Sequence, residues 1–98
     1  MGKTLDGIIT SWNPAAERLF GHSAQDVIGK PMLMVFPPEL HDEEAMLLAR
    51  IARGETVLSF DTVRMHRDGR RLPVSVTLSP IRDGQGQIVG VSKVARDI

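Results

Sequence analysis

The stretch from Gly7 to Gly21, GIITSWNPAAERLFG, predicts a strand that leads directly into a capped helix. β-Branched and aromatic residues at positions 8–12 favour a short strand, and the Asp-Gly pair just before them favours a turn. Asn13 is a preferred N-cap residue, and Pro14 suits the first helical position because the N–H it lacks would be unpaired there. A helix should therefore begin after Asn13 and end at Gly21.

The next segment predicts further helices. Residues 23–26 have the S-x-x-D form that can cap a short helix. A longer helix is expected over about residues 40–53, because a set of apolar positions at helical spacing precedes Gly54. The expected buried face of this helix consists of Ala45, Leu48, Ile51 and Ala52.

After Gly54 the apolar pattern changes to a period of two. Residues 57–65 predict a strand, residues 66–69 a hairpin turn, and residues 72–78 a half-buried strand. A second turn at residues 83–86 precedes a last strand over residues 88–94. This order predicts an α+β fold, with one antiparallel sheet and the helices packed on one of its faces.

Composition narrows the function classes. A chain of 98 residues forms one domain, and 42% hydrophobic residues suit a globular core. Twelve basic and twelve acidic residues give no net charge, so no nucleic-acid partner is expected. No stretch reaches the roughly 20 apolar residues of a membrane span, and the absence of cysteine suits a reducing compartment, so we expect a cytoplasmic location.

Two polar groups are interpreted as solvated. The basic run of Arg64, His66, Arg67, Arg70 and Arg71 surrounds the predicted hairpin turn, where polar side chains are ordinary. The acidic run at residues 42–44 is interpreted as favourable charge in the first turn of the long helix, without an organised partner. His22 and His66 are expected to be exposed.

Several segments in this order resemble the bacterial PAS domain, the sensory module of proteins such as sensor histidine kinases. Residues 67–69, Arg-Asp-Gly, are similar to the family's hairpin turn, and Ala95-Arg96-Asp97-Ile98 is similar to the start of its signal-transfer motif. The other matching segments are residues 7–21, 27–30, 37–39, 79–83 and 86–90. The resemblance covers nearly the whole chain and implies a single PAS-type domain over residues 1–98, with a five-stranded sheet.

Two departures from the family pattern affect this expectation. The family's first strand lies centrally in the sheet, and only residues 1–4 are available for it here. These residues either form a truncated strand or leave a gap that a neighbouring chain fills, because unpaired central backbone groups are unfavourable. We therefore expect a homodimer. The chain also stops at Ile98, before the expected signalling helix and C-terminal output domain.

The resemblance raises the question of a cofactor, whose identity the sequence leaves unknown. Flavin–cysteine adducts and cysteine-linked chromophores are excluded because the chain has no thiol. At the position that resembles the haem ligand of oxygen sensors the chain has Glu43, with His41 about half a helical turn away. His41 is the haem-ligand candidate, but we interpret it as a solvated histidine and do not expect haem.

A small apolar ligand is the remaining possibility that the resemblance suggests. The family's pocket lies between the inner face of the sheet and the long helix, and the alternative for the same residues is simple core packing. The candidate lining residues are Met32, Met34, Leu48, Ile51, Phe60, Val74, Val76 and Leu78.

Three residues are expected to have structural or signalling roles. Replacement of the N-cap Asn13 by Ala should lower stability by about 1 kcal/mol. Trp12 should pack near the sheet, and its indole N–H needs an acceptor if it is buried. By resemblance, Asp97 anchors the last strand to the helix that continues from it.

Two functions follow as hypotheses. The first is a sensory and regulatory input domain of a bacterial histidine kinase or cyclic-di-nucleotide enzyme (a diguanylate cyclase or phosphodiesterase), which binds a small ligand or dimerises to relay a signal. The alternative is a ligand-free protein–protein interaction and dimerisation module. No catalytic motif such as G-x-S-x-G, H-E-x-x-H or a P-loop is present, so the domain itself is not expected to be an enzyme.

Overall fold

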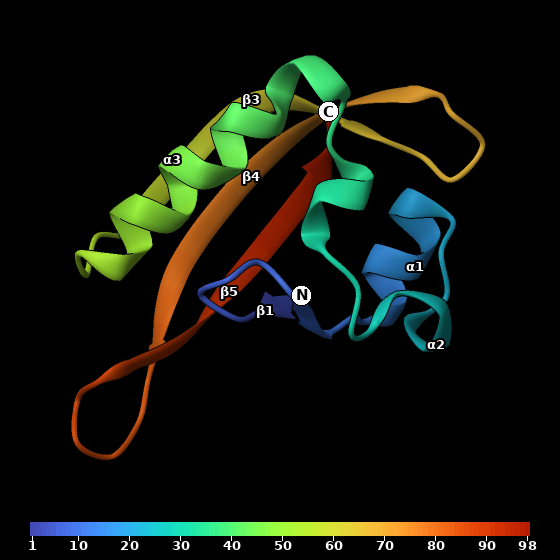
Figure 1. Cartoon of the computed structure of the whole chain (residues 1–98). Coiled ribbons are helices and arrows are strands. Elements are labelled where there is room, and N and C mark those ends of the chain that lie inside the picture. Colours follow the sequence, from blue (N-terminus) through green and yellow to red (C-terminus); the bar gives the residue numbers. More distant parts are fainter.

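The period-two segments build a five-stranded antiparallel sheet in the strand order β2-β1-β5-β4-β3 (Figure 1). The computed structural model describes all 98 residues, Met1–Ile98. Three long strands form a meander from the second half of the chain, and the hairpin between its last two strands projects away from the helices. The α+β architecture expected from the sequence is confirmed. The strands are β1 (Gly2–Lys3), β2 (Ile9–Ser11), β3 (Val57–Met65), β4 (Arg71–Arg82) and β5 (Ile88–Asp97).

The truncated first strand is present as β1. Gly2 and Lys3 pair with β2 on one side and with β5 on the other, so these two residues occupy the centre of the sheet. Of the two alternatives for this position, the chain's own short strand is the one observed. An open central edge is therefore no argument for a dimer.

The helical segments follow their capping signals. Oδ1 of Asn13 accepts a hydrogen bond from the Ala16 N–H at 2.8 Å, and Gly21 ends the first helix with a φ of 79°. Oγ of Ser23 accepts one from the Asp26 N–H at 3.3 Å. No helix is long and apolar enough to cross a bilayer. The helices are α1 (Pro14–Phe20), α2 (Ala24–Val27), η1 (Met32–Val35), η2 (Pro38–Leu40) and α3 (His41–Ala52).

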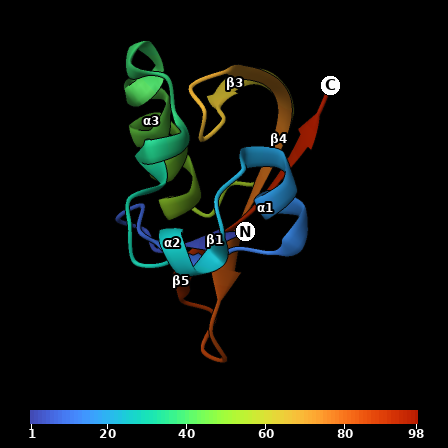
Figure 2. The same ribbon diagram turned by 90° about the vertical axis from the view of Figure 1, so that its right-hand side faces the viewer.

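The long helix α3 lies against the inner face of β3 and β4 (Figure 2), but its buried face differs from the expected one. Glu44, Leu47 and Ile51 are buried and Leu48 is half-buried, whereas Ala45 and Ala52 are exposed. The buried positions 44, 47 and 51 fit the period of a helix as well as the predicted positions do. The face turns toward Glu44 because this carboxylate has a buried partner on β1, described below.

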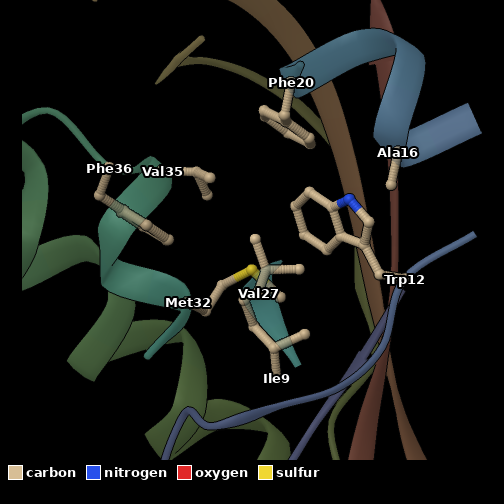
Figure 3. Packing of buried hydrophobic residues seen from close by; sticks show 8 residues of the cluster. All are labelled: Ile9, Trp12, Ala16, Phe20, Val27, Met32, Val35 and Phe36. Carbon is tan, nitrogen blue, oxygen red and sulfur yellow. The ribbon is translucent and has the colours of Figure 1, made fainter. Parts of the chain in front are cut away.

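Two apolar clusters form the core. The first joins α1, α2 and η1 and contains the tilted aromatic pair of Trp12 and Phe20, whose centroids are 5.4 Å apart (Figure 3). Trp12 is buried, and its Nε1–H donates to the carbonyl of His22 at 2.9 Å, as its burial requires. The second cluster joins α3 to the inner sheet face at Val74, Val76 and Leu78.

The hairpin between β3 and β4 is less solvated than expected. Arg64 is fully buried, and His22 and His66 are half-buried, so the expectation of exposure is wrong for these three residues. The other members of the basic run, Arg67, Arg70 and Arg71, are exposed as expected. The hairpin folds back on α1, where the Arg67 N–H donates to the carbonyl of Phe20 at 2.8 Å. His66 packs directly beside Gly21.

Candidate functional site

A cluster of charged side chains lies in the interior, between α3 and the inner face of the sheet. Three are cations with at most 1% of their surface exposed, and they come from β1, β3 and β5. Two are neighbouring carboxylates at the start of α3, of which Glu44 is buried and Glu43 is half-buried. Charged residues are almost never fully buried without a specific partner, so this concentration distinguishes the region from ordinary core. The members are Lys3, Glu43, Glu44, Arg64 and Lys93, and we call them the buried charge cluster.

Strand register places the cations inside. Residues directly opposite each other in an antiparallel pair point to the same face of the sheet. Arg64 faces Leu72 across β3 and β4, and Lys93 faces the buried Leu78 across β4 and β5. Both cations thus occupy positions whose neighbours are apolar and inward.

Two of the cations are paired. Nζ of Lys3 donates to Oε1 of Glu44 at 2.5 Å, and Nη2 of Arg64 donates to Oε1 of Glu43 at 2.6 Å. The Thr62 hydroxyl also donates to Glu43, at 3.0 Å, and Nη1 of Arg64 donates to the carbonyl of Val63 at 2.9 Å. The pairs connect α3 to β1 and to β3.

Lys93 has no such partner. Its Nζ is fully buried and makes no hydrogen bond, and Oε2 of Glu44 and Nε of Arg64 are also unpaired. The centroid of the Phe36 ring lies 5.1 Å from Nζ, and the charges of Glu44 and Glu43 also favour the protonated amine. Cζ of Arg64 lies 3.8 Å from the same centroid, so one aromatic ring serves two cations.

The electrostatic consequences are large for Lys93. Burial, and then the charges of Lys3 and Arg64, hold the pKa of Lys93 well below its ordinary value. Burial also lowers the pKa of Lys3, although the charge and hydrogen bond of Glu44 oppose this effect. The cluster therefore has two matched ion pairs and one amine in an environment that disfavours its protonation.

Two surface hollows reach the carboxylate side of this cluster. One, of about 460 Å³, lies between α3 and β3 and includes Glu43, Leu47 and Phe60 in its wall. The other, of about 200 Å³, lies between α3 and the segment leading into η1, and includes Glu44 and Leu48. The two carboxylates of the cluster are thus at the walls of separate openings.

The eight residues predicted to line a pocket are divided by the structure. Leu48 and Phe60 each line one of the hollows, and Met34 is exposed. Met32 belongs to the first apolar cluster. Ile51, Val74, Val76 and Leu78 are fully buried in the second.

None of the residues predicted for other roles belongs to the charge cluster. His41 is exposed at the start of α3, on the rim of the smaller hollow. Asp97 is exposed at the end of β5. A cap at Asn13 is confirmed by its hydrogen bond.

The charge cluster itself was missed, and the interpretation of residues 42–44 as unpartnered surface charge is wrong for Glu43 and Glu44, whereas Asp42 is exposed. Glu43 and Glu44 are each paired with a cation from a distant strand. The strand register did contain a signal for two of the cations. The hairpin turn at residues 66–69 places Arg64 opposite Leu72, and Lys93, two residues after the buried Val91, shares its inward face of β5. Lys3 had no local signal, because its partner is 41 positions away.

Comparison with known proteins agrees with this architecture. The family model for the PAS fold matches residues 1–98, so the chain belongs to the PAS family. The chain is 35% identical over 95 residues to biofilm dispersion protein BdlA of Pseudomonas aeruginosa, covering 95% of the chain and 22% of that protein. It is 33% identical over 93 residues to two-component system protein A of Emericella nidulans, covering 94% of the chain and 14% of that protein.

Among solved structures, the PAS domain of a protein from Colwellia psychrerythraea superposes with a TM-score of 0.87 at 27% identity, over 99% of this chain and 82% of that one. This is a sensory, non-catalytic fold, and the chain is a PAS sensory domain homologous to signalling proteins. It spans only about a fifth or less of the length of these two curated relatives.

Proposed function

We propose that this chain is the ligand-responsive input domain of a cytoplasmic bacterial signal-transduction protein. A small molecule held between α3 and the inner sheet face changes the packing of α3 on the strands. The change passes along β5 to an output domain beyond Ile98, with Asp97 at the junction. The candidate lining residues Leu48 and Phe60, at the two hollows, are the first that such a molecule meets.

The buried, unpartnered amine of Lys93 carries this proposal. An unpaired polar group in a core destabilises the fold by about 1–3 kcal/mol, and more when it is charged, so a purely structural core has little reason to contain one. A bound molecule that interacts with Lys93 would remove that penalty. Because a ligand shifts a conformational equilibrium only through differential contacts, such an interaction is also what signalling requires.

The parent protein is proposed to be a histidine kinase or a cyclic-di-nucleotide enzyme. One relative is a two-component system protein, and both relatives are several times longer than the chain, which supports additional domains in the parent.

The second element of the proposal is a homodimer formed through the outer face of the sheet. If the domain binds no ligand, dimerisation through this face is its alternative function. On this face Val94 is 51% exposed and Ile81 is 41% exposed, among hydroxyl side chains such as Ser75 and Thr77. A ligand-free interaction module would use the same face to transmit strain between two copies.

Native mass spectrometry of the freshly purified domain, together with its absorbance spectrum, separates the two functions. A stoichiometric additional mass that is lost on unfolding supports the sensor. A Soret band would identify haem and assign His41 a role that its exposed position does not suggest. Bare protein mass with a dimer peak, and no gain in stability from any small molecule in a metabolite extract, would favour the interaction module.

A further inference from the structure

We propose that the ligand is a small aromatic carboxylate, whose carboxylate lies beside Lys93 and whose ring takes the place of Phe36. This inference rests on the proposed sensory function and specifies the chemical class of the molecule sensed.

The pairing within the buried cluster leaves the amine of Lys93 available to an anionic ligand. Lys3 is paired with Glu44 and Arg64 with Glu43, whereas Nζ of Lys93 has no hydrogen-bond partner, although Oε2 of Glu44 is unpaired as well. With all five groups ionised, three cations face two anions. A carboxylate on the ligand would complete the third pair, and the unused Nε of Arg64 could donate to it as well.

The position of Phe36 specifies the rest of the molecule. Its ring is buried and lies next to both Arg64 and Lys93. Figure 3 shows Phe36 at one side of the first apolar cluster, away from Trp12 and Ala16. An aromatic ring in the same place keeps the attraction of both cations for a π face, whereas an aliphatic anion would lose it.

A surface hollow lies near the segment that holds Phe36, although Phe36 itself does not line it. Phe36 lies between η1 and η2, and the hollow of about 200 Å³ includes Leu33 from η1 and Glu44 from α3. Phe36 leaves its place when the segment between η1 and α3 moves outward, and a ring of similar size enters. The exchange conserves buried apolar area, which is why the replacement can be reversible.

Binding of an anion should be linked to uptake of a proton. The groups that face Lys93 are the cations Lys3 and Arg64, the carboxylates Glu43 and Glu44, and the terminal ammonium of Met1. Burial disfavours the charged form of this amine. A carboxylate beside Nζ favours the charged form and raises its pKa. The amine therefore gains a proton as the anion binds.

The test uses benzoate, with neutral benzamide of nearly the same shape as the matched compound. We expect benzoate at millimolar concentration to raise the melting temperature of the domain, and benzamide to have no such effect. Calorimetric titration in two buffers of different ionisation enthalpy should show net proton uptake with benzoate.

Two variants locate the site. Lys93→Met keeps the length and apolar stem of the side chain and should weaken benzoate binding at least tenfold. Phe36→Ala vacates the place of the ring and should bind benzoate at least tenfold more tightly than the native chain. If Phe36→Ala does not fold, Phe36→Leu is tested in its place. Phe20→Leu, at a buried aromatic with no recorded contact to the cations, is the control and should leave affinity unchanged.

Equal effects of benzoate and benzamide, or equal benzoate affinity in Lys93→Met and the native chain, would overturn the proposal. So would failure of the native chain and both Phe36 variants to bind benzoate. These failures are distinct from failure of the sensory function: a neutral ligand retained in native mass spectrometry would leave the sensor intact and remove only the anionic class.

Discussion

Nζ of Lys3 and Oε1 of Glu44 lie 2.5 Å apart in the interior, and this contact joins the central strand β1 to the start of α3. Loss of one partner leaves a buried charge uncompensated, which typically destabilises by about 3–5 kcal/mol. We therefore expect Glu44→Gln to lower the free energy of unfolding by about that amount in urea titration. The double variant Lys3→Met with Glu44→Leu should recover most of the loss, because neither charge remains.

The surface pair of Arg53 and Glu55 is the control for this prediction. Nε of Arg53 is 2.8 Å from Oε2 of Glu55, but both side chains are well exposed. Exposed pairs contribute little, so Glu55→Gln should leave the urea midpoint almost unchanged. If Glu44→Gln were as mild as Glu55→Gln, the interior pair would have no structural importance.

Lys93 should make stability depend on alkaline pH. Its pKa is lowered in the folded state, so the unfolded chain binds more protons, and stability rises with pH up to the ordinary lysine value of about 10.4. Lys93→Met removes this penalty, and we expect it to stabilise the ligand-free domain at pH 7 by about 1–3 kcal/mol.

The difference in unfolding free energy between Lys93→Met and the native chain should become smaller as the pH approaches about 10.4. Lys3 and Arg64 also have lowered pKa values, but they are present in both proteins, so the difference between the two isolates Lys93. Urea titrations at several pH values measure it. A difference that stays constant across this range would contradict a buried, titrating Lys93.

Local signals predicted the fold well, and long-range pairing was the part that they could not supply. The strand over residues 57–65 has the predicted bounds, and Asn13 caps its helix, because alternation and capping depend on neighbours in sequence. The helix face of α3 was misjudged because apolar spacing alone favoured Ala45 over Glu44. Glu44 is buried because it pairs in the interior with Lys3, which is distant in the sequence.

The close approach of Gly21 to His66 gives a test of the contact between α1 and the β3–β4 hairpin. An added Cβ at Gly21 would lie 2.5 Å from Cε1 of His66, whereas one at Gly29 meets nothing within 4 Å. Both glycines have positive φ, so alanine at either position carries a backbone penalty of about 1–2 kcal/mol. Gly21→Ala should be destabilising by about 1–3 kcal/mol more than Gly29→Ala, because of overpacking.

Thermal unfolding of the two alanine variants measures this excess, and His66→Ala in combination with Gly21→Ala should remove it. Persistence of the full excess in the double variant would show that the histidine ring is not its cause.

The outer face of the sheet gives the last prediction, which concerns the proposed dimer. Val94 is exposed on β5 and lies opposite Thr77 of β4, on the face away from α3. A glutamate there would place two like charges near each other across a symmetric interface and would need desolvation on association. Val94→Glu should therefore raise the dimer dissociation constant at least tenfold, as measured by sedimentation velocity over a concentration series.

Met46→Glu is the matched control, because Met46 is 66% exposed on α3, which covers the opposite face, and this variant should dimerise like the native chain. Equal weakening by both variants would place the interface elsewhere, and unchanged association of Val94→Glu would exclude this face as the dimer contact.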